Sequence, residues 1–363
     1  MVIRKIGVLR ANALGDLIVS LPALAALKES YPNAELVLLG RRSHFELFNG
    51  RKPVDRVIVL PPSIQFDRPI ELNEENQKIV DAIKEEKFDV LVQLHGGGRY
   101  SNAFVNMLRP LISVGAKTSD APPLSRYRPY TQFQHEVLRE LEVVELLGAK
   151  GSSFTPRISL PDDEKNEGRN VLHHILGNNK GRIVLLNPGA TDPRRRWPAE
   201  KFGDVAKRLA LKDTVLVNSG PGEEKISEAI KSICPEVKII QPSLRELLAL
   251  LSNCDLVISN DTGTMHLSMA IEVPTVALFW HRNVMNYAPV KSENTRLLVS
   301  WQSQCSTCGA NCCKEMCEHE DSLLNELSVQ EVLKASEELL ERVGGSNHLA
   351  EDHRGRVWLK PSK

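Results

Sequence analysis

The 363-residue chain lacks a net charge, because 46 Lys and Arg residues balance 46 Asp and Glu residues. A neutral balance gives no reason to expect a nucleic-acid partner. The chain also lacks an apolar run of about 18 residues, which a membrane-spanning helix would need. Its N-terminus enters a strand-like segment directly, without the apolar region of a signal peptide. We therefore expect a cytoplasmic protein.

Cysteine is scarce outside one short segment. Cys234 and Cys254 are isolated, and we expect both to be buried as small apolar residues. The other five cysteines form a dense cluster: Cys305, Cys308, Cys312, Cys313 and Cys317. A cytoplasmic location disfavours disulfides, thiolates at this spacing suit a structural zinc or iron ion, and a thiol-rich loop without a ligand is the third interpretation.

What the sequence has in quantity is an alternation of short apolar strands and helices, which predicts parallel sheets covered on both faces. In the first half we expect strands at 5–10, 35–39, 57–60 and 90–94, helices at 17–30, 73–86 and 134–147, and a surface loop at 118–132. In the second half we expect strands at 182–186, 214–218, 238–240, 256–259 and 275–279, and helices at 199–211, 243–251 and 267–271.

The length of the chain suits two domains, and polar residues near 160–164 suit a linker. We expect domains at 1–160 and 161–327, a helix at 328–343 that packs back on the first domain, and a loosely ordered tail at 344–363. Ligands of open α/β sheets bind beyond the carboxyl ends of the strands. The loops at those ends are therefore expected to face a cleft between the domains.

The segment from Asn260 to His266 joins a predicted strand to a predicted helix. Asp261 or Thr262 can cap the helix, and Gly263 lets a ligand approach the backbone next to Thr264. The first N–H groups of a helix lack intrahelical partners, and the helix dipole favours negative charge there. The segment is either a capped helix start or an anion site.

Two further loops follow predicted strands. Gly15 permits a sharp turn before a helix, and Asp16 is either the cap of that helix or a general base. Arg194, Arg195 and Arg196 lie in the second loop, which is either a solvated basic turn or a clamp for phosphate oxygens.

Three weaker signals complete the set. Glu223 and Glu224 follow a Gly-rich turn, where either can cap a helix or bind the hydroxyls of a ribose. The turn from His95 through Gly97 to Arg99 can contact a substrate. The basic and aromatic segment 126–130 is either a solvated loop or a contact with a glycolipid or membrane surface.

Taken together, four stretches resemble glycosyltransferase family 9, the ADP-heptose:lipopolysaccharide heptosyltransferase family. They are residues 13–24, 187–190, 195–198, and 259–266 with 274–279. The resemblance implies a GT-B fold, in which two Rossmann-like domains face each other across a central cleft. It implies that the N-terminal domain binds the acceptor and the C-terminal domain binds the nucleotide-sugar donor.

The resemblance also assigns roles to residues. It makes Asp16 the general base. Because their loops lie in the N-terminal half, we expect Gly15, His95, Gly97 and Arg99 on the acceptor side. On the donor side it implies Arg195, Asp261, Thr262, Gly263 and His266, with either Glu223 or Glu224 at the ribose. We also expect Arg196 and Thr264 on the donor side, since they lie in the same two loops. Arg195 stands where the family usually has Lys, and members of the family often carry a Cys-x2-Cys segment near 305–308.

The expected reaction is an inverting transfer of a heptose, or a similar sugar, from an ADP-sugar to a hydroxyl of a glycan or glycolipid such as the lipopolysaccharide inner core. No Asp-x-Asp metal motif is present, so we expect catalysis without a metal or other cofactor. Peripheral contact with the inner membrane would bring the enzyme to such an acceptor. The alternatives are an epimerase-like enzyme and a non-catalytic nucleotide-sugar-binding protein.

Overall fold

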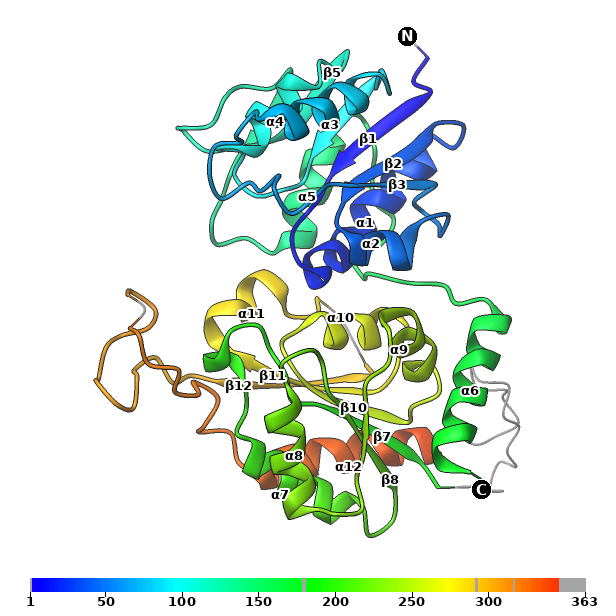
Figure 1. Cartoon of the computed structure of the whole chain (residues 1–363), viewed down its shortest axis with the longest axis vertical. Helices are drawn as coiled ribbons and strands as arrows, with labels where there is room; N and C mark the ends of the chain where they lie inside the picture. The colour runs from blue at the N-terminus through cyan, green and yellow to red at the C-terminus, as the bar shows by residue number, and fades with distance from the viewer. Residues whose placement is uncertain (1, 178–180, 291–292, 316, 346–363) are drawn as a thin grey trace. The chain divides into compact units, whose positions relative to one another are not determined.

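The computed structural model describes residues 2–177, 181–290, 293–315 and 317–345. The chain folds as two compact units, Met1–Pro156 and Arg157–Lys363. The domain boundary expected after residue 160 lies four residues beyond this division. Each unit is built around its own parallel sheet (Figure 1).

The first unit contains a six-stranded sheet within the described residues, in the order β3-β2-β1-β4-β5-β6. Its strands are β1 (Lys5–Leu9), β2 (Glu35–Gly40), β3 (Arg56–Val59), β4 (Val90–Gln93), β5 (Ile112–Lys117) and β6 (Arg126–Pro129). Its helices are α1 (Leu14–Ser30), α2 (Arg42–Phe48), α3 (Glu74–Lys84), α4 (Ser101–Met107) and α5 (Glu136–Glu145). The order of the strands reverses between β1 and β4, which is where doubly wound sheets bind their ligands.

The second unit repeats this winding. Among the described residues its sheet has six strands in the order β12-β11-β10-β7-β8-β9, so the reversal lies between β7 and β10. The strands are β7 (Ile183–Asn187), β8 (Thr214–Asn218), β9 (Lys238–Ile240), β10 (Leu256–Asn260), β11 (Thr275–Trp280) and β12 (Thr295–Ser300). The helices are α6 (Asp162–Leu176), α7 (Ala199–Leu209), α8 (Glu224–Ile233), α9 (Leu244–Leu251), α10 (Gly263–Ala270), α11 (His281–Tyr287) and α12 (Val329–Gly345).

The central strands are largely apolar because helices cover both faces of each sheet. In the first unit, α3 and α4 contribute Val80 and Phe104 to a core with Leu39 and Leu91 of the sheet. In the second unit, α7 contributes Phe202 to a core with Leu186 and Ile258. Burial at these positions supplies the main driving force for each unit.

Two expectations about irregular segments are wrong. The expected loop 118–132 contains the edge strand β6, whose residues are all exposed and therefore carry no apolar alternation. The expected linker near 160–164 is the first turn of α6, which packs against α9. A Cβ atom at Gly168 of α6 would lie 2.1 Å from the Ala249 carbonyl oxygen, so this helix requires glycine where it crosses α9.

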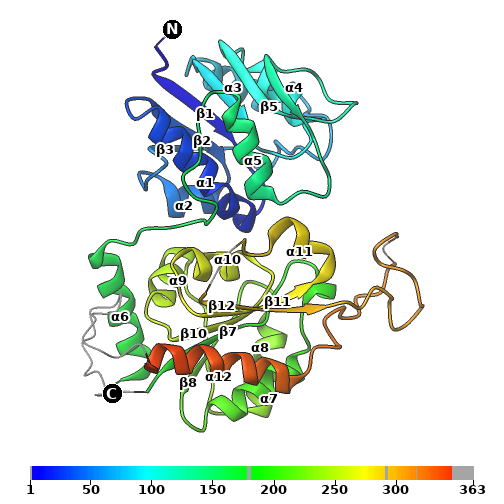
Figure 2. The ribbon, with the colours of Figure 1, turned by 180° about the vertical axis from the view of Figure 1, so that it is seen from behind.

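The helix expected at 328–343 is α12, but it does not pack as expected. Val332, Ala335, Leu339 and Leu340 are buried in the core of the second unit. Figure 2 shows α12 lying across the sheet of that unit. The helix completes its own unit because its apolar stripe covers β10, β11 and β12. Of the tail expected from 344 onward, all but the last two residues of α12 lies outside the described residues.

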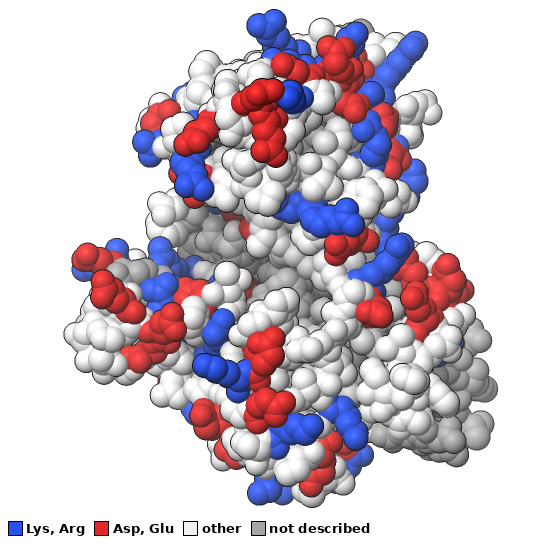
Figure 3. All heavy atoms as spheres, viewed as in Figure 1, with Lys and Arg blue, Asp and Glu red and all other residues white. Residues whose placement is uncertain are grey.

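Charges of both signs are mixed on the visible face of the molecule. Figure 3 shows Lys and Arg residues interspersed with Asp and Glu residues on the visible face, without a broad field of one sign. No helix in the described part of the chain is long and apolar enough to cross a bilayer.

Candidate functional site

A cavity of about 650 Å³ opens in the second unit at the carboxyl ends of β7, β8, β9 and β10. Its walls are the residues that directly follow these strands, such as Gly189 after β7, Ser219 after β8, Gln241 after β9 and Thr262 after β10. The cavity therefore lies at the point where the strand order reverses, the expected ligand position in a doubly wound sheet.

Glu223 and Glu224 both line this cavity, but their environments differ. Glu223 is half-buried, and its Oε2 accepts a hydrogen bond of 2.9 Å from the Gly220 N–H. A Cβ atom at Gly189 would lie 1.8 Å from Glu223 Oε1, so this carboxylate rests directly on the Gly189 backbone. Glu224 is exposed and accepts from the Gly222 N–H at 3.3 Å. Glu223 is thus the carboxylate held at a fixed place in the cavity.

Thr262 and Thr264 also line the cavity, at the start of α10. Thr262 occupies the N-cap position, but its side chain makes no capping hydrogen bond. Its Oγ1 instead accepts from Asn187 Nδ2 at 3.1 Å, and Asn187 Oδ1 accepts from Asn218 Nδ2 at 2.8 Å. The expectation of a side-chain cap is therefore wrong. The hydroxyl is held by a polar chain that crosses three strand ends.

That polar chain was not predicted from the sequence. Asn187 and Asn218 are the last residues of β7 and β8, and Ser219 follows directly. Ser219 Oγ is buried and has no hydrogen-bond partner among the described residues. The sequence did hold one signal for this polar chain. Asn187 and Asn218 are polar residues at the ends of apolar strands, where a buried side chain faces the ligand position.

Asp261 lies between the last residue of β10 and the N-cap of α10. Its carboxylate is the most enclosed one in the predicted anion site, with a side-chain exposure of 6%. Its Oδ2 accepts from Arg195 Nη1 at 3.2 Å and from Asn283 Nδ2 at 2.6 Å. Its Oδ1 lies 3.6 Å from His266 Nε2. Burial alone would raise the pKa of Asp261, but His266, Asn283 and Arg195 outweigh burial and hold the pKa below its usual range.

The arginine loop is not a free basic patch. Arg194 pairs with Asp192 at 2.9 Å, Arg195 pairs with Asp261, and Arg196 Nε donates to the Ala190 carbonyl at 2.8 Å. Five predicted donor residues are not among those that line the cavity: Arg195, Arg196, Asp261, Gly263 and His266. The structure brings Arg195, Asp261 and His266 together beside the helix start whose Thr262 and Thr264 line the cavity.

In the first unit, Asp16 is not the N-cap of α1. The N-cap is Ala13, and Asp16 stands in the first turn beside the buried Gly15. Its Oδ2 accepts from the Ala13 N–H at 3.1 Å, while its Oδ1 lies 3.5 Å from Arg10 Nη2. The side chain keeps 18% of its surface exposed, so the carboxylate is partly open to solvent.

Arg10 connects Asp16 to two further carboxylates that the sequence did not indicate. Its guanidinium has 2% exposure, and Nη2 lies 3.0 Å from Glu140 Oε1 and 3.7 Å from Glu136 Oε2. Burial, with the nearby charge of Glu136, raises the pKa of Glu140 to about 8, although Arg10 opposes the shift. The only sequence signal was the spacing of two acidic residues by four on α5, which usually marks an exposed face.

The remaining predicted residues of the first unit lie in two separate positions, one near Asp16 and one away from it. His95 Nδ1 accepts from the Ala11 N–H at 3.2 Å, which joins the loop after β4 to the loop after β1. Burial and the charge of Arg10 lower the pKa of His95 to about 3, so its ring is neutral at physiological pH. Arg99 is exposed and pairs with Asp120 at 3.2 Å, and Gly97 lies beneath Thr118. The structure therefore brings His95, but not Arg99, toward the Asp16 cluster.

The cysteine cluster is rearranged relative to the prediction. Ligand atoms of Cys305, Cys308, Cys317 and His319 all lie within 4.8 Å of one another. Cys312 and Cys313 do not belong to this group, and Cys313 Sγ lies 3.2 Å from His281 Nε2. The described cysteines form no disulfide. His319 was missed because the prediction considered cysteines alone.

Two doubly wound units, one with a cavity at its switch point, define a two-domain class of α/β protein that binds ligands beyond its strand ends. The model of glycosyltransferase family 9 (heptosyltransferase) matches residues 77–319, more than half of the chain. The chain belongs to this family and is a glycosyltransferase. Membership sets aside the epimerase-like and non-catalytic alternatives.

Heptosyltransferases of two bacteria are similar to this chain over most of its length. Lipooligosaccharide heptosyltransferase 2 of Campylobacter jejuni is 26% identical over 308 residues, which cover 83% of this chain and 89% of the relative. Lipopolysaccharide heptosyltransferase 1 of Escherichia coli is 21% identical, covering 76% of this chain and 87% of the relative.

Solved structures of the family share the fold. The family 9 glycosyltransferase of Veillonella parvula has a TM-score of 0.76 and 22% identity, and covers 94% of this chain and 99% of its own. The E. coli ADP-heptose LPS heptosyltransferase II has a TM-score of 0.74 and 18% identity, with the same coverage. These similarities confirm the GT-B fold class. A more distant neighbour, the iron-containing glycosyltransferase TibC of E. coli, has a TM-score of 0.54 and 11% identity, and covers 94% of this chain and 77% of its own.

The raised pKa of Glu140 predicts a pH dependence of stability. Because the folded state holds a proton that the unfolded carboxyl releases above about pH 4.5, this group's contribution to the free energy of unfolding should fall as pH rises from about 5 to 8. Glu140→Gln should remove that decline. Urea denaturation of both proteins across this pH range measures the difference, with the exposed Glu85→Gln as control. Parallel pH profiles for the wild type and Glu140→Gln would contradict the assignment.

Proposed function

We infer that the enzyme transfers a heptose from an ADP-sugar to a hydroxyl of a lipopolysaccharide-type glycolipid, with inversion and without a metal. The observation that carries the donor assignment is the order of chemical surfaces across the cavity of the second unit. From β9 to β10 these surfaces are apolar, then acidic, then a helix N-terminus. This is the order of a base, a ribose and a diphosphate.

The apolar end of the cavity suits a nucleotide base. Pro242, Leu244 and Leu247 follow β9, and Pro221 follows β8, and all four line the cavity. Apolar walls of this kind stack against a planar base, while nearby backbone groups supply hydrogen bonds. The base would therefore lie at the β9 edge.

The middle of the cavity suits a ribose. Glu223 is held against Gly189 and Gly220, between the ends of β7 and β8. A carboxylate accepts hydrogen bonds from two adjacent hydroxyls. Its fixed position makes Glu223, rather than the exposed Glu224, the ribose-binding residue in this proposal.

The diphosphate would lie at the start of α10. Backbone N–H groups at a helix N-terminus attract anions, and Thr262 and Thr264 place that terminus in the cavity wall. Arg195 adds a permanent charge beside it. Strands lie about 4.8 Å apart, so three spacings from β9 to β10 give roughly 14 Å for the nucleotide. Charge that develops on the leaving diphosphate would meet donors already in position.

Asp16 is the proposed general base of the first unit. Its carboxylate accepts from the Ala13 N–H and lies beside Arg10, and its partial exposure leaves it accessible to a hydroxyl. Attack on the face opposite the diphosphate would invert the sugar in one displacement. In the active enzyme the two units would close so that Asp16 reaches the donor. His95 and the nearby Gly97 and Arg99 remain acceptor-side proposals.

The names of the relatives support the choice of sugar and acceptor. The C. jejuni relative is a lipooligosaccharide heptosyltransferase, and the E. coli structure is named for ADP-heptose. We place the enzyme in the cytoplasm, with peripheral contact at the inner membrane where a glycolipid acceptor would be presented. Phosphate charge is neutralised in this proposal by Arg195 and backbone groups rather than by a metal.

A thermal-shift screen tests the donor. ADP-heptose should raise the melting temperature more than UDP- or GDP-sugars do, because the ribose at Glu223 is common to all three and the apolar base wall is the part that distinguishes them. Glu223→Gln should weaken ADP-heptose binding by about tenfold, equivalent to about 1.4 kcal/mol, whereas Glu224→Gln should change it by less than about twofold. Equal stabilisation by UDP-sugars would contradict the donor, and equal losses in both variants would contradict the role of Glu223.

Asp16→Asn tests the base. Without a proton acceptor, kcat should fall by about 10²- to 10⁴-fold, while ADP-heptose affinity stays within about twofold because the donor cavity belongs to the other unit. Transfer to purified acceptor and calorimetry of donor binding measure the two quantities. Asp81→Asn, on the exposed face of α3, is the control and should match the wild type. A near-normal kcat in Asp16→Asn would exclude it as the base.

A further inference from the structure

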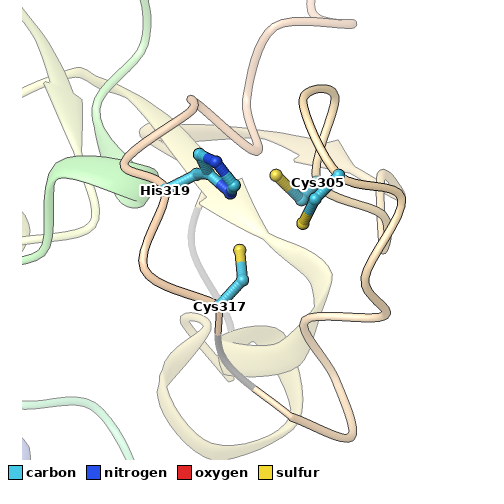
Figure 4. Close-up of side chains that lie close together, drawn as sticks. Cys305, Cys317 and His319 are labelled. Atoms are coloured by element: carbon cyan, nitrogen blue, oxygen red, sulfur yellow. The ribbon is translucent and has the colours of Figure 1, made fainter.

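A cysteine–histidine cluster lies in the segment between β12 and α12, outside the residues that line the cavity. This segment extends away from the sheet of the second unit (Figures 1 and 2). Figure 4 shows Cys305, Cys317 and His319 pointing toward one another. With Cys308, they offer three sulfur atoms and one ring nitrogen, all within 4.8 Å of one another.

We propose that Cys305, Cys308, Cys317 and His319 bind one Zn²⁺ ion in a structural, tetrahedral site. Zinc lies about 2.3 Å from sulfur and about 2.1 Å from nitrogen, so the edges of the tetrahedron are roughly 3.8 Å long. The observed upper limit of 4.8 Å therefore requires shifts of only about 1 Å. Four protein ligands fill the coordination shell and leave no open position, which distinguishes a structural site from a catalytic one.

The turn that joins Cys305 to Cys308 is held in place by hydrogen bonds from its own backbone and to Asp321. The Gly309 N–H donates to the Cys305 carbonyl at 2.9 Å, and Gly309 has a φ of +74°, a conformation that favours glycine. Asp321 Oδ2 accepts from Ser306 Oγ at 2.8 Å and from the Thr307 N–H at 3.0 Å. Asp321 thus fixes both residues between the two cysteines, as residues around a metal site commonly do.

The neighbouring Cys313 has another partner and provides an internal control. Cys313 Sγ contacts His281 Nε2 at 3.2 Å, and the His281 ring stacks on Trp301 at 5.6 Å. Cys313 lies in the same loop and has the same chemistry as the proposed ligands. Its replacement should therefore leave the metal bound.

The cluster leads directly to the arginine loop. Three residues after His319, Ser322 Oγ donates to the Arg196 carbonyl at 2.5 Å, and the Leu323 N–H donates to the Arg194 carbonyl at 2.8 Å. These two bonds hold the backbone on either side of Arg195. The metal would anchor the segment that supports this backbone. The expected effect of the metal on donor binding rests on the proposed function, whereas the metal site itself does not.

Metal content of the full chain tests the site. Protein purified without added zinc and analysed by inductively coupled plasma mass spectrometry should contain about one zinc per chain. Cys308→Ser and His319→Ala should each lose most of it, and both positions are exposed, so the fold should tolerate the changes. Cys313→Ser should keep about one zinc per chain. Cobalt substitution should give the thiolate charge-transfer bands of a tetrahedral site, with weaker bands in Cys308→Ser, which removes one of the three thiolates.

Three results would overturn the proposal. One is a wild-type chain that holds no zinc after incubation with Zn²⁺ and dialysis. Another is equal loss of zinc in Cys313→Ser and Cys308→Ser, which would refute the ligand set. The third is stoichiometric iron in place of zinc, which would refute the choice of ion.

Donor binding separates this inference from the proposed function. His319→Ala should weaken ADP binding by about fivefold or more through the arginine loop, and Cys313→Ser should not. Zinc retention with unchanged ADP affinity in His319→Ala would overturn both the ligand role of His319 and its support of the loop. Stoichiometric zinc in a wild-type chain that fails to bind ADP would leave the metal site standing and overturn the donor assignment.

Discussion

The ion pair between the buried Asp261 and the half-buried Arg195 is the contact on which the proposed donor side depends. A carboxylate with 6% exposure is costly unless it is fully paired. Asn283 and His266 supply the remaining partners from α11 and α10. Removing one of these partners would leave the buried Asp261 charge with fewer donors, which destabilises the fold. The pair therefore fixes the arginine loop, the start of α10 and α11 as one assembly beside the cavity.

The two units have the same strand order, but they bury opposite charges at the ends of their strands. At the carboxyl end of β1, a buried cation, Arg10, is surrounded by Asp16, Glu136 and Glu140. At the carboxyl end of β10, a buried anion is surrounded by donors. An excess of carboxylates favours accepting a proton, whereas an excess of donors favours holding an anion. A transfer reaction needs one of each, and the proposed mechanism assigns them accordingly.

The sequence predicted the features that depend on local pattern and failed where tertiary contacts decide. Apolar strands followed by Gly-containing turns located the doubly wound units and Thr262. The same approach missed α6, whose Gly168 looks like a helix breaker until α9 lies against it. It also treated Arg195 as free, because a partner 66 positions away leaves no local signal. Glu140 was missed for the same reason, since its partner Arg10 follows β1 and is far away in the sequence.

In the proposed mechanism Arg195 acts on the donor diphosphate, and Asp261 affects donor binding only by holding Arg195 in place. A double-mutant cycle with Arg195→Gln and Asp261→Asn, read by calorimetry of ADP binding, tests it most directly. If the account is correct, each single change weakens binding and the double variant binds about as well as Arg195→Gln alone, because Asp261 has no separate effect to lose. If the two losses simply add, the residues act independently, and the pair does not organise the phosphate end of the cavity.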